Sequence, residues 1–291
     1  MGFHWSRTDS DIGAGFVRIA REQIAKAIDG ARNETETSER RVHEARRRCK
    51  KLRALFLLVR PDFDALRDEN RFVRDCARGL SAARDIRVAS STFADLMRWA
   101  GRPVATAPRE AGNAAGEAEA LQRFVDRMHE LQARTDTWKV GRISLDSLTS
   151  GLAHTYRRAR RSRRLAEKHR TDEAFHEWRK YAKYHWNQLG LLEECAEDIL
   201  PSAYKSAGDL GEVLGLHHDL AVLEAVIARS PADLHAEVDA GFLADAIERR
   251  RAELERRIAT LGRQVFAERP EALKARFDAY LETWPAREAA E

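Results

Sequence analysis

One group of basic residues and a histidine occurs twice in the chain with the same spacing. Segment 43–50 reads His-Glu-Ala-Arg-Arg-Arg-Cys-Lys, and segment 176–183 reads His-Glu-Trp-Arg-Lys-Tyr-Ala-Lys. Both fit the pattern His-Glu-x-Arg-(Arg/Lys)-x-x-Lys, whose basic members fall at helical spacing. A helix face of this kind presents ammonium and guanidinium donors along one line, about 5–6 Å apart. The pattern therefore predicts a shaped anion-binding face in each half of the chain.

A second pair of segments indicates internal duplication. Segment 80–88 has the pattern Leu-x-x-x-Arg-Asp-Ile-x-Val, and segment 214–222 has Leu-x-x-x-His-Asp-Leu-x-Val. The two pairs occur in the same order and at nearly the same offset, which is hard to obtain by chance. We therefore predict that the two halves of the chain are repeats of one helical unit.

Each basic helix should be amphipathic. In the first copy, Ala54 falls on the same predicted face as the basic residues of segment 43–50. The predicted apolar faces are formed by Ala45, Cys49, Leu52, Leu55, Phe56 and Val59 in the first copy, and by Trp178, Ala182, His185, Leu189 and Leu192 in the second. Like charges at these spacings each destabilise a helix by roughly 0.2–0.5 kcal/mol, which a bound anion would relieve.

Positive charge is concentrated near the two copies. The whole chain has 51 Lys and Arg against 47 Asp and Glu, but segment 40–60 holds nine basic residues and one acid. A second basic run, 156–164, precedes the second copy, and Arg18 and Arg21 form a thinner counterpart before the first. Basic helices are often merely solvated surfaces. A solvated surface does not require fixed spacing, however, so the duplication favours a binding site.

The composition predicts an all-α protein. The chain has 291 residues, seven prolines and no alternating run typical of a strand. This length suggests two domains or subdomains, and we expect a first half at 1–100, a small-residue-rich linker at 101–117 and a second half at 118–291. The helices are expected near 9–32, 37–60, 62–79, 81–99, 120–135, 144–169, 172–195, 200–214, 217–230, 234–262 and 271–283.

Several familiar kinds of site are not indicated. The metalloprotease helix requires a second histidine where this chain has Arg47 and Lys180. His217, His218 and Asp219 are adjacent, so on a helix they point about 100° apart and cannot easily share an ion. No glycine-rich phosphate loop, nucleophile elbow or paired carboxylates occur. We therefore expect no metal, no cofactor, no catalytic residue and no enzymatic activity.

The chain shows no signal for a membrane or an oxidising compartment. Its three cysteines are isolated, with no Cys-x-x-Cys pair, so neither a disulfide framework nor a zinc ribbon is indicated. No apolar stretch approaches the 18 residues typical of a membrane span, and the N-terminus has no secretory signal. These observations predict a cytoplasmic protein without a membrane partner.

The paired basic helices, each followed by an (Arg/His)-Asp-(Ile/Leu)-x-Val segment, resemble the CHAD family, the conserved-histidine α-helical domain. The resemblance covers roughly residues 10–230. It implies two pseudo-symmetric four-helix bundles whose basic faces converge on a central groove or pore. It also implies binding of inorganic polyphosphate, and many relatives are associated with polyphosphate granules, so granule components would be further partners.

The resemblance also implies which residues bind polyphosphate. From the two patterns these are His43, Arg46, Arg47, Lys50, His176, Arg179, Lys180 and Lys183. Further cations are expected from Arg18, Arg21, Arg53, Arg157 and Arg161. Site-organising roles are expected for Arg84, Asp85, His218 and Asp219. The second copy has Tyr184 and Trp186 where the first has Lys51 and Arg53, so the two half-sites are expected to differ.

Three classes of function remain open at this stage. Non-catalytic polyphosphate binding is favoured by the fixed spacing. A general nucleic-acid or polyanion binder is favoured by the calculated pI near 9.0 and the arginine run, although no base-reading motif occurs; under the first hypothesis nucleic acid would be a weaker competitor. An enzyme acting on polyphosphate or a triphosphate would need acidic residues for a divalent metal. Segment 34–38, Glu-Thr-Glu-Thr-Ser, lacks the lysine of the CYTH triphosphatase motif.

Overall fold

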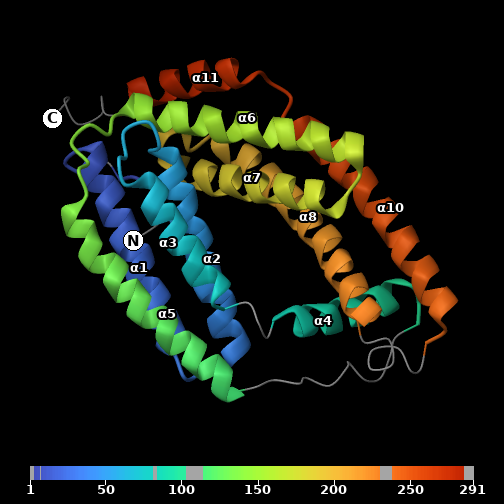
Figure 1. The fold of residues 1–291 in the computed structure, drawn as a ribbon. Helices are drawn as coiled ribbons and strands as arrows, with labels where there is room; N and C mark the ends of the chain where they lie inside the picture. The colour runs from blue at the N-terminus through green and yellow to red at the C-terminus, as the bar shows by residue number, and fades with distance from the viewer. Residues whose placement is uncertain (1–2, 7, 81–83, 103–113, 230–237, 285–291) are drawn as a thin grey trace.

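The structure is a computed structural model that describes residues 3–6, 8–80, 84–102, 114–229 and 238–284. Within these ranges the chain forms α-helices and two short 3-10 turns, without a strand, which confirms the predicted all-α class (Figure 1). The helices are α1 (Ile12–Arg32), α2 (Ser38–Leu58), α3 (Leu66–Arg78), α4 (Arg84–Trp99), α5 (Ala114–Arg134), α6 (Leu145–His169), α7 (Asp172–Leu191), α8 (Leu200–Arg229), α10 (Ala240–Val265) and α11 (Pro270–Thr283); the 3-10 turns are η1 (Thr135–Thr137) and η2 (Glu193–Ala196).

The two helices that carry the repeated pattern begin in the same way. The hydroxyl of Thr37 accepts a hydrogen bond from the backbone N–H of Arg40 at the start of α2, and Thr171 accepts one from Ala174 at the start of α7. Such caps satisfy backbone donors that have no partner within the helix. Acidic residues in both first turns also suit the positive end of the helix dipole. The caps therefore fix where each basic pattern lies along its helix.

The apolar faces predicted for α2 and α7 are confirmed residue by residue. Every predicted apolar-face residue of both copies is buried, including Cys49 and Leu52 in α2 and Trp178 and His185 in α7. Ala54 is a correction, because it is fully buried rather than on a cationic surface. At this point α2 meets α7, and the amide of Gln188 donates a hydrogen bond to the Ala54 carbonyl at 3.1 Å. The basic face of α2 therefore ends where the two helices touch.

Two predicted helix boundaries were wrong. Segment 200–229 is one continuous helix, α8, where two helices were expected, and α5 begins at Ala114 inside the predicted linker. Gly211 lies within the first of these predicted helices and Gly215 in the gap between the two, and glycine within a helix costs about 1 kcal/mol relative to alanine. In the structure, side chains of α7 pack directly over both glycines. Tertiary packing therefore outweighs the local preference.

Helices from the first half of the sequence pack against helices from the second half. Helix α5 follows the predicted linker but packs against α1, and α4 precedes it but packs against α8 and α10 (Figure 1). The two basic helices, α2 and α7, contact one another. The halves 1–100 and 118–291, the linker at 101–117 and the arrangement as two four-helix bundles stay predictions. Residues 103–113 of that linker lie outside the described part of the chain.

Aromatic residues fill the core on both sides of α2 and α7. Phe16, Phe56, Phe63 and Trp138 form one cluster with ring centroids 4.9–6.2 Å apart. On the other side, the Tyr156 ring lies 5.1 Å from Phe266 and 5.1 Å from the buried imidazole of His185.

Among the described helices, none is both long and apolar enough to cross a membrane.

Helix α6 crosses α2 at a glycine. A Cβ atom on Gly151 would lie far inside van der Waals contact with the carbonyl group of Leu58, at the end of α2. This contact involves backbone on both helices, so neither side can rotate away. The close crossing therefore requires glycine at this position.

We predict that Gly151→Ala destabilises the protein by about 3 kcal/mol, because the methyl group forces α6 away from α2. The measurement is the free energy of unfolding in denaturant. Gly141→Ala is the matched control, because a Cβ there meets nothing within 4 Å, and we expect its effect to stay within about 0.5 kcal/mol. Equal effects for the two variants would contradict the close crossing.

Candidate anion-binding pocket

Lys and Arg residues from three helices line one cavity of about 480 Å³. We call this cavity the basic pocket. Its Lys and Arg residues come from α2, α3 and α7, and two histidines from α7 and α8 complete its basic lining. They are Arg46, Lys50, Arg53, Arg74, Arg78, Arg179, Lys180, Lys183, His176 and His218. Among the described residues that line the pocket, Glu177 is the only acid.

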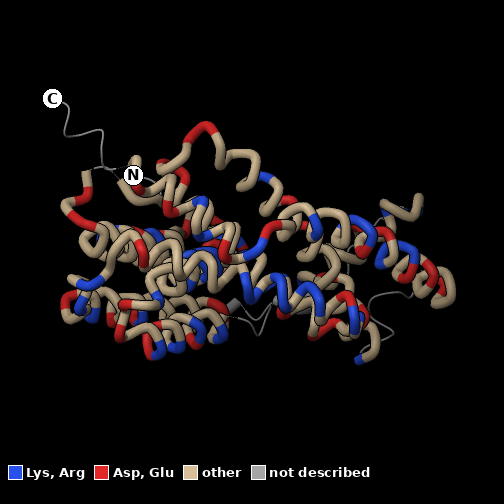
Figure 2. The backbone as a smooth tube through the Cα atoms, turned by 90° about the horizontal axis from the view of Figure 1, so that it is seen from above, with Lys and Arg blue, Asp and Glu red and all other residues tan. Residues whose placement is uncertain are grey.

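The distribution of charge over the whole molecule does not reveal this site. Seen from above, Lys, Arg, Asp and Glu are spread together along the helices (Figure 2), in line with a net charge of only +4. The basic pocket differs from that average because eight Lys and Arg residues share its lining with one carboxylate. Its local potential is therefore positive, which suits an anion.

The α2 side of the pocket is held by hydrogen bonds to α3. Arg46 donates through Nη1 to the carbonyl of Ala77 at 2.9 Å, in the last turn of α3 where backbone acceptors lack helical partners. Arg53 donates through Nε to Asn70 at 2.9 Å, and its guanidinium lies 5.4 Å from the Tyr184 ring. These contacts orient both guanidinium groups on the pocket wall.

The α7 side of the pocket is pressed against α8. A Cβ on Gly211 would lie 3.0 Å from Cδ and 3.1 Å from Nζ of Lys183, and one on Gly215 would lie 3.8 Å from the Arg179 guanidinium. Burial, followed by the nearby charge of Arg179, lowers the pKa of Lys183. The two glycines thus allow cations to sit close together in a partly dehydrated place.

His176 lies among these cations and contacts the second histidine of the pocket. Its ring centroid is 4.7 Å from that of His218. Loss of hydration, and then the charges of Arg179 and Lys180, lower the pKa of His176. The carboxylate of Glu177 acts in the opposite direction. The imidazole is therefore neutral near pH 7 in the free protein and can donate one hydrogen bond.

The residues of the first copy of the pattern line two separate cavities. Arg46 and Lys50 line the basic pocket, whereas His43 and Arg47 line a separate cleft at the start of α2. Arg47 is paired there with Glu44 at 2.7 Å, and Glu36 and Glu39 also line the cleft. In the second copy all four predicted residues, His176, Arg179, Lys180 and Lys183, line the basic pocket. The two copies therefore contribute unequally.

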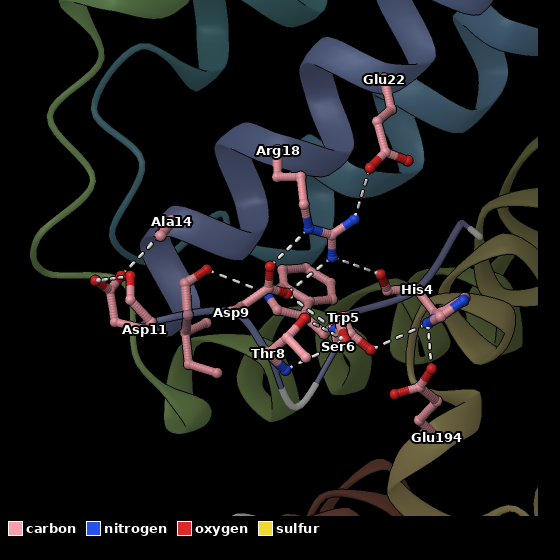
Figure 3. A network of polar contacts seen from close by, with 12 residues as sticks. His4, Trp5, Ser6, Thr8, Asp9, Asp11, Ala14, Arg18, Glu22 and Glu194 are labelled. Atoms are coloured by element: carbon pink, nitrogen blue, oxygen red, sulfur yellow. Dashed lines mark hydrogen bonds and ion pairs between the residues drawn. The ribbon is translucent and has the colours of Figure 1, made fainter. Parts of the chain in front are cut away.

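Arg18 and Arg21 lie outside the basic pocket and are paired with acids elsewhere, as Figure 3 shows for Arg18. Arg18 pairs with Asp9 at 2.6 Å and Glu22 at 2.9 Å and donates to the His4 carbonyl, and the hydrogen bond to Asp9 is the main reason that its pKa is raised. Arg21 pairs with Asp136. Arg18 thus holds the N-terminal segment on α1.

The α6 cations also differ from expectation. Arg157 pairs with Glu271 of α11 at 2.9 Å, and Arg161 is exposed; neither lines the basic pocket. Their neighbour Arg158 instead lies 3.8 Å from Glu177, with its guanidinium 5.0 Å from the Tyr181 ring. The described residues of α6 do not line the basic pocket, and this basic run contacts a pocket residue where Arg158 approaches Glu177.

The predicted site-organising residues are only partly described. His218 lines the basic pocket, and Asp219 follows it on α8. Arg84 and Asp85 begin α4, but their side chains lie outside the described part of the structure. Their predicted role therefore stays a prediction.

Helix α3 contributes basic residues that the sequence reasoning missed. Arg74 and Arg78 line the basic pocket, and Arg67 and Arg71 continue the row along the same helix. At 100° per residue these four side chains fall within about 60° of one another. The spacing i, i+4, i+7, i+11 was therefore visible in the sequence. We call these four residues the α3 arginine row.

The donor set of the site does not resemble a metal centre. Among the described residues, no group of three or more His, Cys, Asp or Glu side chains could hold a metal ion. The basic pocket offers one carboxylate, and Lys180 pairs with it. The arrangement is suited to holding a multiply charged anion through charge-assisted hydrogen bonds.

We predict that Glu177→Gln lowers the pKa of His176 further, because the carboxylate that favours imidazolium is removed while Arg179 and Lys180 remain. An NMR titration of the His176 ring in the free protein measures this. Glu282→Gln, an exposed substitution in the last turn of α11, is the control and should leave the titration unchanged. An unchanged or raised pKa in Glu177→Gln would contradict the described electrostatics.

Comparison with protein families identifies the family of this chain. The family model of the CHAD domain matches residues 16–228 of the 291-residue chain. This span includes both copies of the basic pattern and every helix that lines the basic pocket. No curated protein and no solved structure matches the chain. Because the family model covers well over half of the sequence, the chain belongs to the CHAD domain family.

Proposed function

We propose that this protein binds inorganic polyphosphate in the basic pocket without catalysing a reaction on it. The observation that carries the proposal is that Arg46 and Lys50 from the first copy, and Arg179, Lys180 and Lys183 from the second, line one cavity. Membership of the CHAD family supports it, because this family is associated with polyphosphate binding. As an extension of the proposal, the protein would act in the cytoplasm and associate with polyphosphate granules and their components.

The chemistry of polyphosphate suits this lining. Polyphosphate is a flexible chain of phosphates that carries about one negative charge each, with oxygens on all sides. Arg46 and Arg179 can offer bidentate hydrogen bonds to such oxygens, whereas Lys183 offers a mobile point charge. Because Lys183 is partly dehydrated, pairing it with a phosphate should be stronger than pairing in open water. Affinity should fall steeply with salt, as it does for other polyanions.

Two alternative functions receive less support. Proteins that bind single-stranded nucleic acid usually stack bases on exposed aromatic rings, but Tyr184 in the basic pocket is buried and lies beside Arg53. An enzyme acting on polyphosphate would need carboxylates to hold a divalent metal, and Glu177 is the only acid among the described pocket residues. Nucleic acid is therefore proposed as a weaker competitor for the site.

We predict that replacing Arg46, Lys50, Arg179 and Lys183 together by alanine abolishes polyphosphate binding, because the two opposed sets of cations are removed. Binding is measured by calorimetry with long-chain polyphosphate, and circular dichroism checks that the helices remain. The matched control replaces four exposed arginines outside the pocket, Arg123, Arg249, Arg256 and Arg257, by alanine.

The control removes the same net charge, so it separates a local site from general attraction. It should retain most of the affinity. Retained affinity in the pocket variant, with an unchanged circular dichroism spectrum, would contradict the assignment. An equal loss in both variants would show that charge alone governs binding.

A further inference from the structure

A second cavity lies next to the basic pocket. It has a volume of about 400 Å³ and is formed by α2, α3, α6 and α7. Arg74 lines both cavities, so the α3 arginine row runs from one to the other. Arg78 lines the basic pocket, whereas Arg67 and Arg71 line the second cavity. With a rise of 1.5 Å per residue, the row extends about 16 Å.

The second cavity has a basic lining without an acid. Five arginines contribute to it, and no Asp or Glu occurs among the described lining residues; the arginines are Arg60, Arg67, Arg71, Arg74 and Arg158. Partial burial, and after it the charges of Arg60, Arg158 and Arg157, lower the pKa of His154, which also lines the cavity, to about 4.

A buried hydroxyl also lines this cavity. Thr155 is 1% exposed, and its Oγ1 has no hydrogen-bond partner among the described residues. A buried polar atom without a partner costs about 1–3 kcal/mol. An anion oxygen in the cavity would accept the missing hydrogen bond. A cationic lining and an unpaired buried donor thus point to the same kind of ligand.

A merely solvated basic surface explains these features less well. The acids of α3 neutralise only part of the arginine row. Asp75 pairs with Arg74 at 3.0 Å and with Arg78 at 3.9 Å, whereas Glu69 is buried and bonds to Arg134 and Trp138. Among the described ion pairs, none includes Arg67 or Arg71, the two arginines of the row that line the second cavity alone. Like charges at these spacings destabilise α3 by roughly 0.2–0.5 kcal/mol per pair, which a ligand would offset.

The duplication does not repeat this feature. The corresponding part of the second half is the start of α8, where Lys205 pairs with Asp209 at 2.7 Å and Glu212 follows. Lys205 is the only Lys or Arg between Leu200 and Glu212, so no basic row forms there. The basic lining therefore extends from the basic pocket along α3 without an equivalent along α8.

We propose that the second cavity is an additional anion subsite, continuous with the basic pocket through Arg74, which makes binding dependent on the length of the anionic chain. This inference rests on the proposed function. A short chain is held by the basic pocket, which has eight Lys and Arg residues. A long chain reaches both cavities and gains the contacts of Arg67, Arg71 and Thr155. The protein therefore selects long polyphosphate over short.

The test compares tripolyphosphate with long-chain polyphosphate on the full-length protein. The variant Arg67→Gln/Arg71→Gln removes two exposed cations of the subsite, and Arg256→Gln/Arg257→Gln removes two exposed cations that line neither cavity. We expect the first variant to bind the long chain about tenfold more weakly, equivalent to ~1.4 kcal/mol. Its affinity for tripolyphosphate, and both affinities of the control, should be unchanged.

A second variant tests the subsite without altering charge. Thr155→Val keeps the side-chain shape and removes the unpaired hydroxyl, so it should weaken binding of the long chain and leave tripolyphosphate binding unchanged. Unchanged long-chain affinity in both subsite variants would overturn the subsite but leave the proposed function intact. Equal losses for short and long chains would show that the two cavities are not separate subsites. If the wild-type protein binds neither ligand, the proposed function and the subsite both fail.

Discussion

The site depends on holding like charges close together in a partly dehydrated place. Helix α7 approaches α8 where Gly211 and Gly215 leave room, so Lys183 and Arg179 pack against the neighbouring helix instead of extending into water. Burial lowers the pKa of Lys183 for this reason. The repulsion between these charges destabilises the free protein, and an anion that enters the pocket relieves the repulsion. The same feature that weakens the free protein should therefore strengthen ligand binding.

The rest of the fold fixes these charges in position. The caps at Thr37 and Thr171 set where α2 and α7 begin, and the buried faces of both helices set their rotation. The crossing at Gly151 locks α6 onto the end of α2. Hydrogen bonds to α3 also hold the guanidinium groups of Arg46 and Arg53. This side of the pocket is thus preformed, and ordering it on binding should cost little conformational entropy.

Much of this arrangement could be predicted from the sequence because helical periodicity reports which face is buried. The apolar faces of α2 and α7, and all four cations or histidines of the second copy, follow from it. Periodicity does not say which part of a wide polar face meets a partner. His43 and Arg47 consequently lie in a different cleft from Arg46.

The remaining differences come from partners that are distant in the sequence. Arg21 meets Asp136, and Arg157 meets Glu271, and no local pattern anticipates these pairings. The continuity of α8 likewise depends on α7 side chains that cover its glycines. The α3 arginine row is different, because its helical spacing is visible in the sequence but it belongs to neither copy of the repeated pattern. A search limited to repeated patterns could not find it.

The central claim is that the basic pocket is shaped for polyphosphate and is not a general polyanion surface. The most direct measurement is binding of long-chain polyphosphate to the purified protein, with single-stranded RNA of equal total charge as competitor at physiological salt. Our account predicts tight polyphosphate binding that the RNA does not displace, because the slimmer chain can enter a cavity lined from three helices. Equal displacement by RNA would contradict it and would reduce the protein to a binder of polyanions in general.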